Sequence, residues 1–177
     1  MHFDGFLRQN DLILFYSMEV IKNKICPFLW FDDSAEEAVA FYSGIFKNSR
    51  IFGISRYPDE GPGIPGKAMT VEFELEGLRY IALNGGPVFK FNETVSFSVS
   101  CENQAEVDYY WEKLTAGGEE GQCGWLKDKY GLSWQIVPVA LGQLLGSGDK
   151  EQAGKVMKAM LAMKKIDIPT LIAAKNT

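Results

Sequence analysis

The fold is decided by the stretch Ile25-Cys-Pro-Phe-Leu-Trp-Phe31, which runs through Asp32-Asp-Ser34 into Ala35-Glu-Glu-Ala-Val-Ala-Phe-Tyr-Ser-Gly-Ile-Phe46. The first segment is short and almost wholly apolar, which is typical of a buried strand. The last segment has apolar residues at helical spacing, and its two early glutamates suit the positive end of a helix dipole. Ser34 is a good N-cap residue. A strand followed by a helix is therefore expected.

Three more strands are expected before Gly85-Gly-Pro87 ends this half of the chain. They are interrupted by a loop rich in proline and glycine and by a turn at Gly77. The strand Met69–Leu75 alternates apolar and polar residues, so one of its faces is expected to be exposed to solvent. The expected strands are Ser49–Tyr57, Met69–Leu75 and Leu78–Asn84. Together these elements make a βαβββ unit.

The second half repeats this order with less clarity. Asn103 is the expected helix cap, and Gly131-Leu-Ser-Trp-Gln135 corresponds to Gly77-Leu-Arg-Tyr-Ile81 as a turn and last strand. A repeat of this kind predicts one supersecondary unit used twice. One strand after the helix has no clear counterpart. The expected elements are a strand over Thr94–Cys101, a helix over Gln104–Leu114, and strands over Gly121–Lys127 and Ser133–Val137.

An amphipathic helical region follows Pro138, so the predicted class is α+β: two βαβββ modules with C-terminal helices. Met18 is a plausible alternative start, and we assign no function to residues 1–17. The expected parts are an N-terminal extension at 1–24, a paired βαβββ domain at 25–138 and a C-terminal helical region at 139–177.

Composition excludes several classes of protein. The 177 residues carry a formal net charge of −5, which argues against binding to nucleic acid. The apolar run Leu12–Tyr16 is far shorter than the roughly 20 residues of a membrane span. Three scattered cysteines indicate reduced thiols in a cytoplasmic protein.

Several motifs resemble those of one known family. They are Ile25–Asp32, Leu83–Pro87, Cys123–Asp128, Gly131–Pro138 and Lys165–Asp167. They are similar to the PhnB-like branch of the glyoxalase/bleomycin-resistance (vicinal oxygen chelate, VOC) superfamily, which is often catalogued as 3-demethylubiquinone-9 3-methyltransferase-like. The resemblance covers residues 25–173. It implies two curved modules around a concave pocket, and a homodimer.

The resemblance also implies where a metal would be held, because metal-dependent members carry His or Glu on the first and last strand of each module. These positions correspond to Pro27, Ile81, Ser96 and Gln135. Proline and isoleucine offer no ligand, and serine and glutamine are weak ligands for a divalent cation. The one histidine is His2. We therefore expect no metal and no cofactor.

A methyltransferase would need a glycine-rich turn between a strand and a helix to cradle its cofactor. The segment Gly61-Pro-Gly-Ile-Pro-Gly66 opens no helix, and Gly117-Gly118 ends one. The catalogue name is therefore unsupported by a motif for S-adenosylmethionine, although a quinone-like or aromatic ligand remains compatible with the sequence.

We expect a small organic molecule to bind in the cleft between the modules, without a metal ion. The alternatives are a metal-dependent lyase, isomerase or dioxygenase of the same fold, and a resistance protein that sequesters a drug; whether the protein is an enzyme stays open. Each polar candidate also has a structural interpretation. Ser96 and Ser98 can belong to a solvent-facing strand, and Gln135 can be a buried amide bonded to the backbone. Asn84 can serve the turn that follows it, and Cys123 can be a structural thiol. The candidate pocket residues are Leu29, Phe31, Asn84, Ser96, Ser98, Cys123, Trp125 and Gln135.

Overall fold

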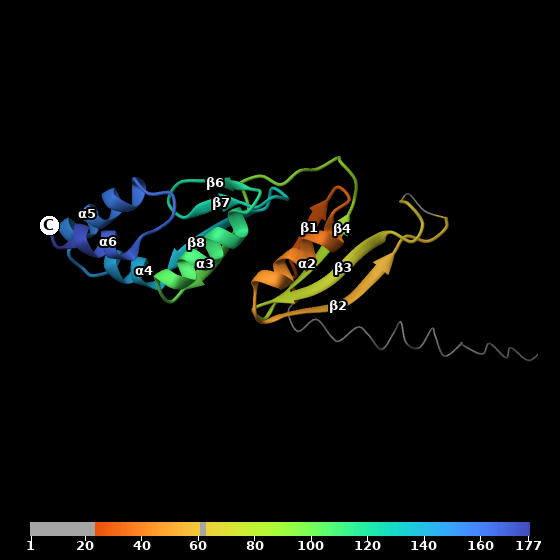
Figure 1. Cartoon of the computed structure of the whole chain (residues 1–177), viewed down its shortest axis with the longest axis horizontal. Helices are drawn as coiled ribbons and strands as arrows, with labels where there is room; N and C mark the ends of the chain where they lie inside the picture. Colours follow the sequence, from red (N-terminus) through yellow and green to blue (C-terminus); the bar gives the residue numbers. More distant parts are fainter. Residues whose placement is uncertain (1–23, 61–62) are drawn as a thin grey trace, which may run out of the picture. The chain divides into compact units, whose positions relative to one another are not determined.

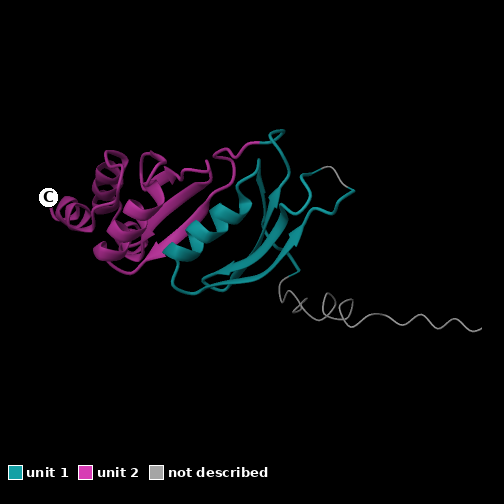
Figure 2. Cartoon of the chain, turned by 45° about the vertical axis from the view of Figure 1, so that its right-hand side comes forward, with its two compact units in different colours: residues 1–89 teal, residues 90–177 magenta. Residues whose placement is uncertain are grey.

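The structure is a computed structural model that describes residues 24–60 and 63–177. It divides into two compact units, with the boundary between Phe89 and Lys90 (Figures 1 and 2). Apart from Lys24, the expected extension at 1–24 lies outside the described residues.

The first unit is a βαβββ module, as predicted. Its sheet has the order β1-β4-β3-β2, in which β1 is parallel to β4 and the other pairs are antiparallel. A parallel pair needs a crossover connection, and between β1 and β4 the chain passes through helix α2 and then through β2 and β3. The elements are β1 (Phe28–Phe31), α2 (Ala35–Ile45), β2 (Ser49–Arg56), β3 (Ala68–Leu75) and β4 (Leu78–Asn84).

The core of this unit lies between the sheet and α2. Strands β3 and β4 alternate between buried and partly exposed residues, because successive side chains point to opposite faces. Phe73 and Ala82 lie on the buried face, and α2, which contributes the buried Tyr42, packs against β3 and β4. The opposite face is open, and Phe28 on it is 54% exposed.

Helix α2 is capped from the sheet and not by its own N-cap residue. The Ser34 side chain makes no capping hydrogen bond, contrary to expectation. Instead, Oδ1 of Asn84 accepts a hydrogen bond from the Ala35 N–H at 2.8 Å, and Nδ2 donates to the Ala68 carbonyl at 3.0 Å. The last residue of β4 thus joins the helix to the start of β3.

The second unit repeats the module with shorter strands. Its sheet has the order β5-β8-β7-β6, and β5 is parallel to β8. The strand that the sequence did not reveal is β6, which has only two residues. The strand expected from Gly121 begins later, at Trp125, because Cys123 and Gly124 have φ of 58° and 84° and form a turn. The elements are β5 (Phe97–Cys101), α3 (Gln104–Thr115), β6 (Glu119–Glu120), β7 (Trp125–Lys127) and β8 (Ser133–Pro138).

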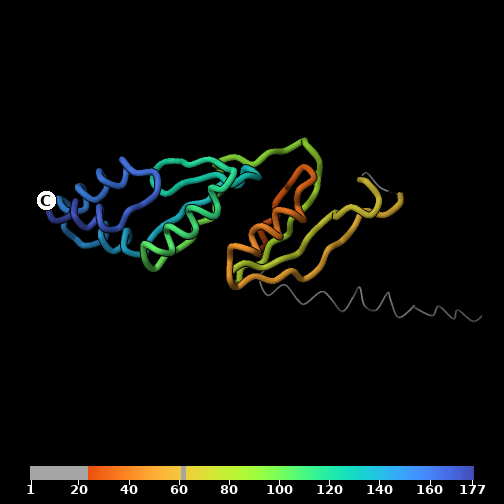
Figure 3. Tube along the Cα trace, viewed as in Figure 1, coloured from red at the N-terminus to blue at the C-terminus, as the bar shows by residue number. Residues whose placement is uncertain are grey.

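Three C-terminal helices belong to this second unit. They are α4 (Val139–Leu145), α5 (Lys150–Leu161) and α6 (Ile168–Lys175), and Figure 3 follows the chain through them. Their core contains Leu141, Val156, Ile166 and Leu171.

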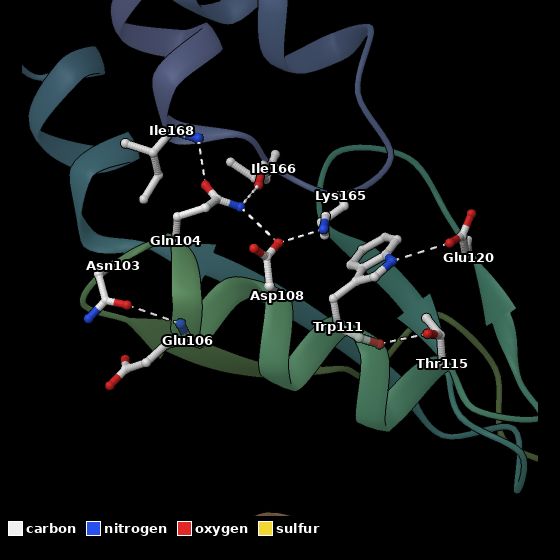
Figure 4. A network of polar contacts seen from close by, with 10 residues as sticks. All are labelled: Asn103, Gln104, Glu106, Asp108, Trp111, Thr115, Glu120, Lys165, Ile166 and Ile168. Atoms are coloured by element: carbon white, nitrogen blue, oxygen red, sulfur yellow. Dashed lines mark hydrogen bonds and ion pairs between the residues drawn. The ribbon is translucent and has the colours of Figure 1, made fainter.

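The segment before α6 is tied to α3 by the polar contacts in Figure 4. Gln104 donates to the Ile166 carbonyl at 3.1 Å and accepts from the Ile168 N–H at 2.8 Å. Lys165 pairs with Asp108 at 2.5 Å. These contacts explain why the predicted helical region is part of the second module. Within the described ranges, no helix is long and apolar enough to cross a bilayer.

Candidate functional site

Three predicted site residues form a row across the second sheet. Ser98 of β5 lies directly opposite Gln135 of β8, and Gln135 lies directly opposite Trp125 of β7. Residues paired in this way project from the same face of a sheet. Ser98 is exposed, and Gln135 and Trp125 are partly exposed. The row therefore presents a hydroxyl, an amide and an indole side by side.

A fourth predicted residue joins the row through a hydrogen bond. Nε2 of Gln135 donates to Oγ of Ser96 at 2.8 Å. The carboxamide has a second N–H and a carbonyl oxygen, so this bond leaves it able to bind another group. The other face of the sheet carries Leu126, Trp134 and Ile136, which are buried against α3. The four polar candidates thus lie on the face that α3 does not cover.

Cys123, the fifth candidate of this unit, has a structural environment. It lies in the turn before β7, and its N–H donates to the Met163 carbonyl at 2.7 Å. The lysines that could activate a thiol have other partners: Lys127 pairs with Glu93 at 2.5 Å, and Lys129 lies 5.1 Å from the ring centroid of Tyr130. A reactive thiol needs such a positive neighbour, so the geometry favours the structural interpretation.

The remaining candidates, Leu29, Phe31 and Asn84, belong to the first unit. All three are buried on the face toward α2, and Asn84 caps that helix. The open face of β1 carries Phe28, which was not among the predicted pocket residues. The stretch from Phe28 to Phe31 is apolar throughout, so no alternation showed which residues face the helix.

The first sheet also carries a charged cluster. The Arg79 guanidinium lies 3.3 Å from the ring centroid of Phe52, and its Nε is 3.7 Å from a carboxylate oxygen of Glu74. Phe52 lies where the β2–β3 register shifts, between Ile51 and Gly53. A bulge changes the face to which a side chain points, and strand periodicity alone does not reveal it.

Buried titratable groups do not supply a nucleophile. Burial raises the pKa of Cys101 to about 12, and Glu106 adds to the shift. The pKa of Cys26 is also raised, by burial and by Glu72, and Arg79 offsets part of this. Both thiols therefore stay protonated near neutral pH, where only a thiolate would attack. Burial likewise raises the pKa of Tyr80 to about 12.

Comparison with protein families identifies this architecture. Residues 23–137 match the family described as 3-demethylubiquinone-9 3-methyltransferase. The chain belongs to this PhnB-like family. The PhnB protein from Bacillus cereus is 36% identical to it, with a TM-score of 0.62, and the match covers 66% of this chain and all of that one.

More distant structures share the fold alone. Protein PA1353 from Pseudomonas aeruginosa is 18% identical over 66% of this PhnB-like chain and 97% of its own, with a TM-score of 0.55. The fosfomycin resistance protein FosX from Listeria monocytogenes, in a complex with Mn(II) and sulfate, is 19% identical over 66% of this chain and 91% of its own, with a TM-score of 0.50. The fold is therefore that of the VOC superfamily. A search of curated proteins found no match.

The residues of this PhnB-like chain do not fit a divalent cation at the superfamily's position. In the first sheet Ile81 lies opposite Phe28, and its N–H donates to the Pro27 carbonyl. In the second sheet the corresponding side chains are Ser96 and Gln135, which are neutral and bonded to each other. Three histidines, thiolates or carboxylates in reach of one ion are not found among the described residues. Neutral amides and hydroxyls do not replace them.

The residues also do not fit S-adenosylmethionine in a nucleotide-type turn. Among the described residues the strand-to-helix junctions are Asp32–Ser34, Glu102–Asn103 and the direct step from Pro138 to Val139, and none of them contains glycine. The glycine-rich loop lies between the antiparallel strands β2 and β3, where the Gly66 N–H donates to the Tyr57 carbonyl. A cofactor cradle requires glycine where a strand enters a helix. These junctions therefore lack the glycine-rich turn that the methyltransferase in the family's descriptive name would need for S-adenosylmethionine.

Proposed function

We propose that this protein binds a small, neutral, planar organic molecule with oxygen substituents on the open face of β5, β8 and β7, without a metal ion. The row of Ser98, Gln135 and Trp125 carries the proposal. An indole packs against a flat ring, with a gain of about 0.5–1.5 kcal/mol beyond simple burial. The hydroxyl and the amide can donate hydrogen bonds to carbonyl or hydroxyl oxygens of the ligand.

The neutrality of the ligand follows from the charges around the row. None of Ser96, Ser98, Trp125 and Gln135 is ionisable near neutral pH. The nearby ammonium group of Lys127 is paired with Glu93 and has Glu119 opposite it in the sheet. An anionic ligand would compete with both carboxylates. The family's description names a demethylated ubiquinone, and a quinone or hydroquinone ring has the flat, neutral, oxygenated form that this row suits.

A direct test uses duroquinone, a fully methylated 1,4-benzoquinone whose ring has no open carbon for thiol addition. We expect saturable binding to the full chain by calorimetry, with the same affinity in excess EDTA. Trp125→Ala should weaken binding about tenfold, because stacking and apolar contact are lost together. Trp125→Phe keeps a ring at this position and should stay within about threefold of the natural chain.

The outcomes separate the rival functions. One tightly held metal ion per chain, required for binding, would overturn the metal-free mechanism and favour a metal-dependent enzyme. A rise in melting temperature with S-adenosylmethionine would favour a transferase, since a ligand that binds the folded state stabilises it. No binding of duroquinone, or equal binding by Trp125→Ala, would remove the proposed site.

A further inference from the structure

Ser133, at the start of β8, carries a buried hydroxyl with no partner. The residue is fully buried, and its Oγ makes no hydrogen bond within the described part of the chain. One other described side chain has a buried hydroxyl without a partner, Ser43 in α2 of the first unit, but that residue as a whole is partly exposed. A buried polar group without a hydrogen bond is costly, so each instance calls for an explanation.

The position of Ser133 connects it to the proposed site. Residues two apart on a strand point to the same face, so Ser133 lies on the side of Gln135, about 7 Å along β8. Lys127 of β7 is its direct partner across the sheet, two residues from Trp125. Ser133 and Lys127 thus form the next pair on the same face of β8 and β7, beside the pair of Gln135 and Trp125.

Neighbouring groups that could have satisfied the hydroxyl have other partners. The Lys127 ammonium group is bonded to Glu93. The Asp128 carboxylate accepts from the N–H groups of Tyr130 and Leu132 and from the Trp134 indole. The Ser133 hydroxyl therefore has no hydrogen-bond partner, while Lys127 and Asp128 beside it are bonded to other groups.

We propose that the Ser133 hydroxyl completes the ligand site by donating a hydrogen bond to a second oxygen of the ring. This inference rests on the proposed function and narrows its ligand class. A ring with oxygens on opposite edges, as in a 1,4-quinone, reaches from Gln135 toward Ser133, whereas a ring with one oxygen meets only one of them.

Access to Ser133 requires a movement of Lys127, whose side chain is its neighbour across the sheet. Its ion pair with Glu93 involves side chains that are 32% and 62% exposed. Exposed pairs contribute little to stability, so a ligand can displace this one at small cost. The entering ring would then bury the face from which the lysine moved.

The chain offers a matched pair of variants for a test. Ser133→Ala and Ser43→Ala each remove a buried, unpartnered hydroxyl, one beside the proposed site and one in the other unit. Neither should lower the melting temperature, because no hydrogen bond is lost. Ser133→Ala should weaken duroquinone binding about tenfold, the effect of one lost hydrogen bond to a ligand, and Ser43→Ala should leave it unchanged.

Each other outcome is decisive. If the natural chain binds duroquinone and Ser133→Ala binds it equally well, the hydroxyl is merely tolerated and this inference is wrong while the proposed function stands. If melting of Ser133→Ala falls by several degrees, the hydroxyl has a structural partner and the inference is also wrong. If the natural chain does not bind duroquinone at all, the proposed function and the inference fail together.

Discussion

The two sheets have the same strand order but different side chains at corresponding positions. In the first sheet the central row of the open face is Phe28, Ile81 and Glu72; in the second it is Ser98, Gln135 and Trp125. In both sheets the row lies three residues before the last pair of the parallel strands, which is Phe31 with Asn84 in the first sheet and Cys101 with Pro138 in the second. Apart from Asn84, which caps α2, the faces toward the helices are apolar because each must pack against a helix. The duplicated unit therefore preserves its core while its open face changes chemistry.

The N-terminal ends of helices α2 and α3 are also capped by different residues. Helix α2 is capped by Asn84 from the last position of β4, but the last position of β8 is Pro138, which has no polar side chain. In the second module the local residue Asn103 accepts from the Glu106 N–H at 3.1 Å instead. Pro138 leads directly into α4, so the end of this strand serves the C-terminal helices.

The largest expected effect comes from the turn that joins the second sheet to its added helices. Gly124 has φ of 84°, and a Cβ there would lie 2.7 Å from the Ile136 carbonyl oxygen and 3.2 Å from Cγ1 of Ile166. Gly124→Ala should therefore lower the free energy of unfolding by about 3 kcal/mol or more, measured by urea denaturation.

Gly131 provides the matched control for this steric effect. Its φ is 87°, but a Cβ there meets nothing within 4 Å. Gly131→Ala should cost about 1–2 kcal/mol, the backbone contribution alone. Equal losses in the two variants would show that contact with Ile136 and Ile166 is unimportant, and that the C-terminal helices are less closely joined to the sheet than the structure indicates.

A second, smaller effect distinguishes the two helix caps. Asn84→Ala removes two buried hydrogen bonds, one with the Ala35 N–H and one with the Ala68 carbonyl, so we expect a loss of about 2–3 kcal/mol in urea denaturation. Asn103→Ala removes one exposed cap bond and should cost about 1 kcal/mol. Ser34→Ala should change little, since its side chain makes no cap bond. A larger loss for Ser34→Ala than for Asn84→Ala would contradict the cap from the sheet.

Local patterns predicted most of the fold. Strand β4 has the predicted bounds, and α2 and α3 end within one residue of them, because alternation, helical spacing and glycine turns are properties of neighbouring residues. Strand β6 was missed because two glutamates carry no periodicity. The cap by Asn84 was missed because it joins residues 49 positions apart, which no local pattern records.

The site was partly predictable for the same reason. Ser98, Gln135 and Trp125 were each predicted as pocket residues, and the structure brings them together on one face of the second sheet. Leu29 and Phe31 were chosen from an unbroken apolar run, where only the packing of α2 decides which face is open. The unpartnered hydroxyl of Ser133 depends on the hydrogen bonds of all its neighbours, so sequence alone did not indicate it.

The smallest expected effect concerns the ion pair between α3 and the tail. Hydrogen bonds from Lys165 and Gln104 hold the pKa of Asp108 below its ordinary value of 3.8. This pairing stabilises the fold above pH 3.8 and is lost as the pH falls through the lowered pKa. Both side chains are exposed by more than 40%, so Asp108→Asn should cost only about 0.5 kcal/mol at neutral pH. Glu36→Gln, which breaks the exposed Arg56 pair of the first module, should cost as little. The deficit of Asp108→Asn should vanish in urea denaturation at about pH 2, where the natural carboxyl is protonated too. A loss of several kcal/mol would instead show that the pair of Asp108 and Lys165 is the main attachment of helices α4 to α6, which the first module lacks. Gln104 and the apolar core would then contribute less than the structure indicates.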